Sequence, residues 1–445
     1  KDGVMKHRLI LDCRVSGTNS ATFKWERILL PKVWDVVRDT LTLQANAHDG
    51  WTFRYLVCDI SDAFYKMPLL PAERPYYVLQ YNLFYYIWLR LGQGSLNGPT
   101  LFGRLSAFVG RASQAILHDI GARIQIYTDD PIVCFSAPDE KINEAVVILI
   151  VFWRILGFSL ATHKAQLASS VSWIGYDIVA TGTGVTVSIK KAFLDDLLKD
   201  TELFLKKNII GIRLLRSYTG RANHIANLLF GWRPFLDTLW AAVAGEPEKI
   251  ITKKRWNKRG KTRSRKSRAP PGTVWTKQVR SSLLWIKRFL KLQHGPLTRT
   301  WSVEEYFSNR ESVAFYLDAS PWGLGGVLVI NGVLVSYFLS PLSAIDETIH
   351  GYAIGDCKGQ QTWECLAVLV ALRIWKAQWT NKRCEVRVKS DNISALAMSS
   401  RMKIKSSPLI AKEIALLYSE AAHEPRIFEH VPGVANVLAD ALSRI

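Results

Sequence analysis

The sequence predicts mixed helices and strands in two folded parts, an α+β part first and an α/β part last. Apolar stretches that end in acidic residues occur in both parts, as in residues 55–59 and 313–318. Residues 249–271 separate them with eleven Lys or Arg and no acid. At 445 residues the chain is long enough for two or three domains, each with its own core.

A pair of adjacent acids, Asp129 and Asp130, lies inside an apolar stretch. Neighbouring side chains of a regular strand point to opposite faces, so both acids can serve one site only from the tight turn of a hairpin. Pro131 is compatible with such a turn, because it fixes its own φ and favours an extended conformation at Asp130. The pattern predicts a metal-binding hairpin tip, although a solvated turn is the commoner outcome for this tripeptide.

A third acid, Asp59, ends a buried strand predicted over residues 55–58, and Ser61 or Asp62 is a candidate cap for a short helical turn. Phosphoryl transfer to a sugar hydroxyl uses two Mg²⁺ ions about 4 Å apart. Mg²⁺ prefers one or two protein carboxylates, completed by water and substrate phosphate. Asp59 and Asp129 supply that pair, which predicts a nucleotidyl-transfer site.

In this region the chain resembles the reverse transcriptase family, in the family's order. The resemblance lies in residues 7–14, 58–64 and 91–99. It implies that Asp59, Asp129 and Asp130 bind two Mg²⁺ ions, with Mn²⁺ as a substitute. It also implies that the ring of Phe64 leaves no room for a 2′-hydroxyl, so that the substrates are deoxynucleotides.

The same resemblance implies further substrate contacts. Lys164 is the candidate general acid near the leaving pyrophosphate, and residues 172–176 resemble the hairpin that holds the primer 3′ end. Arg8 would hold the incoming triphosphate, Arg14 would brace the template side, and Gln93 would position nucleotide and template. The implied substrate-binding set is Arg8, Arg14, Asp62, Ala63, Phe64, Gln93, Gly94, Trp173, Gly175 and Tyr176.

Three positions depart from the family pattern. Pro131 stands where an apolar strand residue usually follows the acid pair, Gly98 replaces a common serine, and Thr128 is an uncommon residue before the acids. These departures favour one alternative, a decayed or domesticated copy that only binds nucleic acid. Retention of every expected carboxylate argues against that alternative.

Helical patterns fill the middle of the chain. Apolar residues recur at helical spacing over residues 100–121, just after Pro99. Residues 181–248 resemble the thumb of retrotransposon enzymes of the LTR or DIRS type. Residues 249–272 are predicted to form a basic tether, either disordered or bound to phosphate, with a nuclear-import signal as another interpretation. Residues 273–310 are predicted to form a helical connector.

The last part, residues 311–445, carries a second set of acids at predicted strand ends and helix starts. They are Asp318, Glu364, Asp391 and Asp440. A hairpin is predicted about Asn331 and Gly332, and Thr362 is predicted to cap the helix that carries Glu364. Such acids converge only in a fold that brings those ends together. The region resembles the ribonuclease H of retroelements, which implies that the four acids bind two Mg²⁺ that activate water against an RNA phosphodiester.

Composition agrees with a nucleic-acid partner. The net charge of +20 indicates a polyanionic ligand. The six cysteines are scattered without metal-binding spacing, which predicts free thiols of a reducing compartment. No signal peptide or membrane-spanning run is present, so the protein is predicted to be intracellular, cytoplasmic or nuclear, and not secreted. Because the chain opens at Lys1, it is expected to be excised from a longer polyprotein.

The predicted fold is therefore an α+β polymerase right hand, with fingers and palm in residues 1–180 and a thumb, followed by an α/β ribonuclease H-like domain. The predicted function is copying of RNA into DNA and hydrolysis of RNA in the RNA–DNA hybrid. The predicted partners are an RNA template, a DNA primer, the hybrid and deoxynucleoside triphosphates, with no membrane. A telomere-type polymerase is disfavoured by the attached ribonuclease H, and the oligomeric state is left open.

Overall fold

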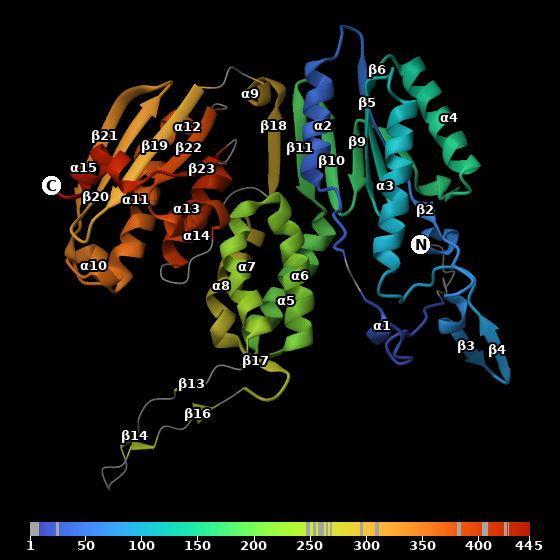
Figure 1. The fold of residues 1–445 in the computed structure, drawn as a ribbon, viewed down its shortest axis with the longest axis horizontal. Coiled ribbons are helices and arrows are strands. Elements are labelled where there is room, and N and C mark those ends of the chain that lie inside the picture. Colours follow the sequence, from blue (N-terminus) through green and yellow to red (C-terminus); the bar gives the residue numbers. More distant parts are fainter. Residues whose placement is uncertain are drawn as a thin grey trace. The chain divides into compact units, whose positions relative to one another are not determined.

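The structure is a computed structural model in which the chain divides into two compact units (Figure 1). The first unit is Lys1–Ser188 with Trp301–Val303, and the second is Ile189–Thr300 with Glu304–Ile445. The structure describes residues 9–445 except 24–25, 246–249, 252–254, 257–261, 264–265, 268, 294–296, 308–310, 381–383, 403–407, 422–424 and 426. Among the described residues, no helix has the length and apolar character needed to cross a bilayer.

A four-stranded sheet in the order β5-β6-β1-β8 lies at the centre of the first unit. Its strands are β1 (Thr52–Val57), β5 (Ala122–Tyr127), β6 (Asp130–Ala137) and β8 (Gln166–Ala168). Successive residues of β1 face opposite sides of the sheet. Leu56 packs in the core formed with helices α3 (Gly98–Ile116) and α4 (Asp139–Ile155). The Tyr55 hydroxyl instead lies 2.9 Å from the Thr40 hydroxyl of helix α2 (Val33–Ala45), so helices cover both faces.

Helix α3 begins close to its predicted start and ends earlier than predicted. Pro99 lies in its first turn, where the missing N–H costs no helical hydrogen bond. The helix ends at Ile116, whereas the apolar spacing continued to residue 121. Leu117 and Ile120 remain in or against the core after the helix ends, which explains why the pattern outlasts the helix.

Smaller elements complete the first unit. They are α1 (Thr18–Ala21), the pair β2 (Ile60–Ser61) and β7 (Ser159–Leu160), the hairpin β3 (Val78–Tyr81) and β4 (Phe84–Ile87), and the sheet strands β9 (Ser170–Trp173), β10 (Tyr176–Thr181), β11 (Gly184–Ile189) and β18 (Thr298–Ser302). The last four strands form a sheet in the order β18-β11-β10-β9. Residues 301–303 thus return to the first unit after a long excursion of the chain.

The second unit begins with helices. They are α5 (Lys191–Lys206), α6 (Ile212–Leu228), α7 (Arg233–Ala244) and α8 (Thr276–Leu290), with the strand pair β12 (Ile209–Gly211) and β17 (Thr273–Trp275). Trp232 stacks on Phe289, and Phe235 packs against the same ring. Within the basic segment the structure describes β13 (Ile250–Ile251) paired with β16 (Lys266–Ser267), and β14 (Arg255–Trp256) paired with β15 (Thr262–Arg263).

A five-stranded sheet in the order β21-β20-β19-β22-β23 ends the second unit. Its strands are β19 (Glu311–Ala319), β20 (Gly323–Ile330), β21 (Val333–Pro341), β22 (Cys384–Ser390) and β23 (Ile427–His430). The first three are antiparallel, and β19, β22 and β23 are parallel. The helices are α9 (Val303–Phe307), α10 (Ala344–His350), α11 (Gln360–Ile374), α12 (Lys376–Trp379), α13 (Ile393–Arg401), α14 (Pro408–Glu420) and α15 (Val437–Ser443).

Local predictions in this sheet have different outcomes. The hairpin about Asn331 and Gly332 is confirmed, because both residues have positive φ, 52° and 84°, as a two-residue hairpin turn of this type requires. The prediction that Thr362 caps its helix is wrong. Helix α11 begins at Gln360, so Thr362 lies inside its first turn, and its buried hydroxyl has no hydrogen-bond partner among the described residues.

Two candidate acidic sites

The hairpin β5–β6 places the acid pair differently from the prediction. Tyr127 pairs with Asp130, so the turn consists of Thr128 and Asp129, and Asp130 is already the first residue of β6. Thr128 has a φ of 58°, the left-handed conformation that closes the turn. The Ser106 hydroxyl on α3 donates to the Thr128 carbonyl over 2.7 Å and holds the turn. Only Asp129 therefore lies in the turn itself.

The register of β1 and β6 places Asp59 opposite Asp130. The Cys58 N–H donates to the Pro131 carbonyl at 3.2 Å, and the Ile60 N–H donates to the Asp129 carbonyl at 3.0 Å. Asp59 and Asp130 stand between these bonds, at a position without backbone bonds, where opposed side chains approach most closely. The two carboxylates therefore lie on the same face of the sheet.

The pKa of Asp130 reports the crowding of acids at this position. Burial, together with the charges of Asp129 and Asp59, raises the pKa of this carboxyl to about 6 against the opposing charge of the Lys164 ammonium. Negative charge gathered beside a partly buried carboxyl forms a site that favours cations. Their oxygens are the ligands that Mg²⁺ prefers, so these residues fit such an ion.

Lys164, the candidate general acid, is paired with the carboxylate of Asp59. Strand β7 pairs with β2, and just after β7 the Ala161 N–H donates to the Asp59 carbonyl at 2.9 Å. From the short turn that follows, the Lys164 ammonium donates to a carboxylate oxygen of Asp59. This lysine remains about half exposed, so its side chain has room to move.

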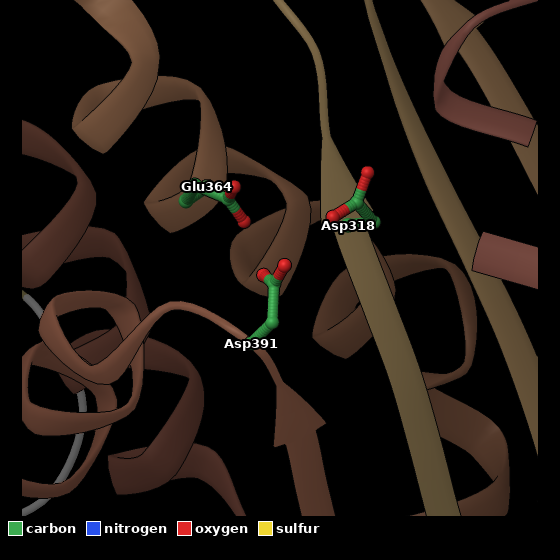
Figure 2. Close-up of side chains that lie close together, drawn as sticks. All are labelled: Asp318, Glu364 and Asp391. Atoms are coloured by element: carbon green, nitrogen blue, oxygen red, sulfur yellow. The ribbon is translucent and has the colours of Figure 1, made fainter. Parts of the chain in front are cut away.

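Three side chains of the second unit form the tightest acidic group. Asp318, Glu364 and Asp391 each offer a carboxylate oxygen within 4.8 Å of the others, and Figure 2 shows these carboxylates gathered in one place. No other group of three potential metal ligands this close occurs among the described residues. The cause is topological: β19 and β22 are parallel with Leu317 opposite Ser390, so the residues that follow them emerge side by side.

Two members of this group, Glu364 and Asp318, have raised pKa values. Burial, with the charges of Asp318 and Asp391, raises the pKa of Glu364 to about 8, and a hydrogen bond from Gln360 opposes this rise. Burial also raises the pKa of Asp318 to about 6, and a hydrogen bond from Ser443 opposes this. One carboxylate oxygen of Glu364 is buried without a hydrogen-bond partner among the described residues. A bound divalent cation would satisfy that oxygen, so the donor set fits Mg²⁺ or Mn²⁺.

The fourth acid of this set, Asp440, lies outside the close group of three. Arg444 donates two hydrogen bonds to one oxygen of its carboxylate, from Nη2 at 2.6 Å and from Nε at 2.9 Å. Asp440 still raises the pKa of Asp318 by its charge. The structure therefore places Asp440 near the group, with Arg444 holding its carboxylate.

Comparison with known proteins identifies the first unit. Residues 6–178 match the family model described as "Reverse transcriptase (RNA-dependent DNA polymerase)". The chain is 25% identical over 195 residues to the Pro-Pol polyprotein of Simian foamy virus type 1, covering 44% of this chain and 15% of that polyprotein. Residues 6–178 form a retroviral-type reverse transcriptase domain.

Other similar proteins cover smaller or larger shares of the chain. The Gag-Pro-Pol polyprotein of Squirrel monkey retrovirus is 30% identical over 135 residues, which are 28% of this chain and 7% of that polyprotein. A solved foamy viral protease-reverse transcriptase in complex with RNA/DNA hybrid is 18% identical with a TM-score of 0.42, covering 96% of this chain and 49% of the other. The chain thus spans less than a fifth of the viral polyproteins that it matches.

The expected sugar gate of the reverse transcriptase domain lies over a glycine. Phe64 belongs to the short helical turn Ala63–Lys66, and its ring centroid lies 5.4 Å from that of Phe102. A Cβ at Gly98 would lie 3.4 Å from the Phe64 ring, so the glycine leaves space beneath it. Asp62 precedes this turn with a φ of 52°, and its side chain makes no capping hydrogen bond.

The glycine-rich loop of the same domain packs against the N-terminal segment. The Leu11 N–H donates to the Gln93 carbonyl at 2.9 Å. Gly94 has a φ of 112°, and a Cβ there would lie 2.0 Å from the Leu11 carbonyl oxygen, so only glycine fits. Arg14 lies on this exposed segment, with its N–H bonded to Asp12. Arg8, the expected triphosphate ligand, lies outside the described residues.

The expected primer-holding hairpin joins β9 to β10 by a turn at Ile174 and Gly175, both with positive φ. The side chains of Trp173 and Tyr176 are 1% and 2% exposed, so they pack inside the domain. These two rings, expected to contact a primer, therefore offer almost no surface for such a contact.

Two residues beside the second acidic group were not predicted from the sequence. The Ser443 hydroxyl donates to Asp318 at 2.7 Å, and the Gln360 amide donates to Glu364 at 3.0 Å. Gln360 precedes Glu364 by four residues, a spacing that places both on one helix face and could have identified it. Ser443 lies in the segment that carries Asp440, but no local pattern assigns its hydroxyl to a strand 125 residues away.

Proposed function

We propose that this chain is an RNA-directed DNA polymerase with a second, separate site that hydrolyses RNA in RNA–DNA hybrids. The observation that carries the polymerase activity is the opposition of Asp59 and Asp130 across β1 and β6, with Asp129 in the adjoining turn. This arrangement stands inside a reverse transcriptase domain. Three acids in one place supply oxygen ligands for two Mg²⁺ or Mn²⁺ ions.

The chain's own residues would divide the work of nucleotidyl transfer. Bound divalent metal ions would activate the primer hydroxyl and balance the charge of the leaving pyrophosphate. Lys164, half exposed and paired with Asp59, would move to the pyrophosphate and donate a proton there. Its departure from Asp59 would free that carboxylate for a cation.

Substrate choice would rest on Phe64. Its ring packs on Phe102 and over Gly98, which hold it in place. A hydroxyl at the sugar 2′ position would therefore clash with this ring. We therefore propose deoxynucleoside triphosphates as substrates, with an RNA template and a DNA primer as partners. The net charge of +20 supports binding to these polyanions.

The proposed division of labour follows the chain. Fingers and palm would occupy residues 1–180, the thumb 181–248, the basic tether 249–272, the connector 273–310 and the ribonuclease H domain 311–445. The six cysteines are free thiols and five are buried, which supports action in a reducing, intracellular compartment.

Hybrid hydrolysis is proposed from the group Asp318, Glu364 and Asp391. Acids at the ends of two neighbouring parallel strands and in the second turn of α11, one turn later than expected for Glu364, supply only oxygen ligands, as a metal-assisted hydrolase of phosphodiesters requires. The unpartnered oxygen of Glu364 supports the same role. No described residue donates a hydrogen bond to this oxygen, and a bound cation would take the place of such a donor.

The rival proposal, a decayed copy that only binds nucleic acid, rested on Pro131. In the structure this proline pairs with Ile126 inside a strand that continues in register to Ala137. Pro131 has no N–H to donate to the Cys58 carbonyl, so one backbone hydrogen bond is missing. The strand pairing that sets Asp59 opposite Asp130 is unchanged, which favours the active enzyme.

Primer extension on an RNA template with Mg²⁺ and deoxynucleotides tests the proposal. We expect extension by the unaltered chain, loss of extension in Asp129→Asn with hybrid cleavage retained, and the converse in Asp318→Asn. Asp119→Asn, an exposed acid after α3, is the matched control and should retain both activities. Absence of extension by the unaltered chain with Mg²⁺ and with Mn²⁺ would overturn the polymerase assignment, and absence of hybrid cleavage would overturn the second site.

A further inference from the structure

Helix α4 of the first unit is apolar on both of its faces. Its inner face carries the buried core residues Ile142, Ala145, Leu149 and Trp153. Its outer face carries four large apolar side chains whose exposed fractions are 60% for Val147, 39% for Ile148, 50% for Val151 and 77% for Ile155. A helix at the surface of a soluble protein normally carries charged or polar residues on its outer face.

The four exposed side chains form one continuous stripe. Residues 147, 151 and 155 are four apart and therefore lie above one another along the helix, with Ile148 beside them. Single exposed apolar residues are ordinary, whereas a contiguous group marks an interaction surface. The stripe lies opposite the buried face of α4, so repacking of the domain's own core would not cover it.

Charges are distributed unevenly along the same outer face. Glu140 and Glu144 stand toward the N-terminal end, in line with the stripe, and Arg154 stands at the C-terminal end. Arg154 is exposed and makes no ion pair with any described residue, whereas Glu144 accepts from Lys141 at 2.9 Å. The face is therefore acidic at one end, apolar in the middle and basic at the other end.

We propose that two copies of this chain associate through the outer faces of α4, packed antiparallel about a two-fold axis near residues 149–150. This symmetry sets Val151 against Ile148 of the second copy, and Glu144 beside Arg154 of the second copy. Each acidic end then meets a basic end, and the two helix dipoles oppose each other favourably. The pattern is self-complementary, as a two-fold interface requires.

The expected dimer is weak and depends on concentration. One helix pair buries less than the about 800 Å² per partner that is typical of stable complexes, so we expect dissociation in the micromolar range. The interface uses none of the acids assigned to either acidic site. The tests of the dimer and of the proposed activities are therefore independent of each other.

Sedimentation velocity of the full chain without nucleic acid, from about 1 to 100 µM, tests this proposal. We expect a concentration-dependent dimer that Val151→Glu abolishes. Glu144→Arg and Arg154→Glu should each weaken the dimer about tenfold by bringing like charges together. An equimolar mixture of those two single variants should dimerise again, because each pair then regains opposite charges, and the double variant should do the same.

Asn143→Arg is the matched control, because it changes the charge of an exposed neighbour that lies off the stripe. It should leave the dimer intact, and circular dichroism should show the same helix content in every variant. A monomer at 100 µM would overturn the proposal and assign the stripe to another partner. A dimer that survives Val151→Glu, or a mixture of single variants that stays monomeric, would overturn it equally.

Discussion

The indole nitrogen of Trp173 donates a hydrogen bond to the backbone carbonyl of Asp130 over 2.9 Å. The ring is buried and also meets Tyr127 edge to face at 6.3 Å, so it touches both strands of the acid hairpin. Trp173 thus fixes the strand that presents Asp130, while belonging to the neighbouring β9. The hairpin expected to hold the primer is linked in this way to the acids by one side chain.

Replacement of this indole donor should slow polymerisation selectively. Trp173→Phe keeps most of the bulk but leaves the Asp130 carbonyl without its bond, at a cost of about 1–2 kcal/mol. We expect the primer-extension rate to fall about tenfold, with hybrid cleavage unchanged. Trp379→Phe, which removes a buried indole bond to Leu372 in the second unit, is the control and should not slow extension. Equal slowing by both variants would contradict this role.

The sugar gate should depend on the ring of Phe64. Phe64→Val should let ribonucleotides in, so that discrimination against them falls by at least about tenfold in single-nucleotide incorporation assays. Phe64→Tyr keeps the ring and should keep the discrimination. Gly98→Ser places atoms against the Phe64 ring and should increase the discrimination further. Unchanged discrimination in Phe64→Val would show that another residue is the gate.

Pro131 should lower stability without being required for activity. Pro131→Val restores an N–H opposite Cys58 in a buried strand, and we expect the first unit to gain about 0.5–1 kcal/mol in the free energy of unfolding. Urea denaturation measures this gain. Pro138→Val, at the exposed start of α4, offers no strand bond and should bring none. A loss of stability in Pro131→Val would mean that the proline ring fills space that valine cannot.

The metal-free second unit should become less stable as the pH rises. The pKa of Glu364 is about 8 in the folded state against about 4.5 when exposed, so the folded state holds more protons between these values. Stability is then fully present below about pH 4.5 and is lost as the pH rises through about 8. Thermal unfolding in EDTA between pH 5 and pH 8.5 should show this decline.

Two comparisons check that Glu364 is the group responsible. Glu364→Gln should flatten the decline, because the amide does not titrate. Added Mg²⁺ should raise the melting temperature more at pH 8 than at pH 5, since it binds the ionised form. A decline that persists in Glu364→Gln would assign the effect to another group.

Sequence reasoning located the acids because each follows a local pattern. Asp59 and Asp318 end apolar strands, and such ends are visible in the sequence alone. The register of paired strands, by contrast, is not a local property. Whether Asp129 or Asp130 faces Asp59 depends on how β1 pairs with β6, and the prediction of two acids in the turn did not include this pairing.

Contacts between distant segments explain the remaining differences. Ser443 reaches Asp318 because helix α15 lies against β20, where a Cβ at Gly325 would come within 2.3 Å of the Ala439 carbonyl. No spacing rule connects those positions. Thr362 looked like a cap because its residue type favours that place, yet the helix starts two residues earlier.

The return of residues 301–303 to the first unit affects how the protein is made. Trp301 lies edge to face on Trp34 at 4.7 Å, and its backbone lies so close to Gly184 that a Cβ there would come within 2.2 Å of its carbonyl oxygen. A ribosome adds about 5–20 residues per second, so a chain synthesised to Ser188 waits several seconds for that strand. Meanwhile β11 is an uncovered sheet edge, the kind of surface through which unfinished chains aggregate.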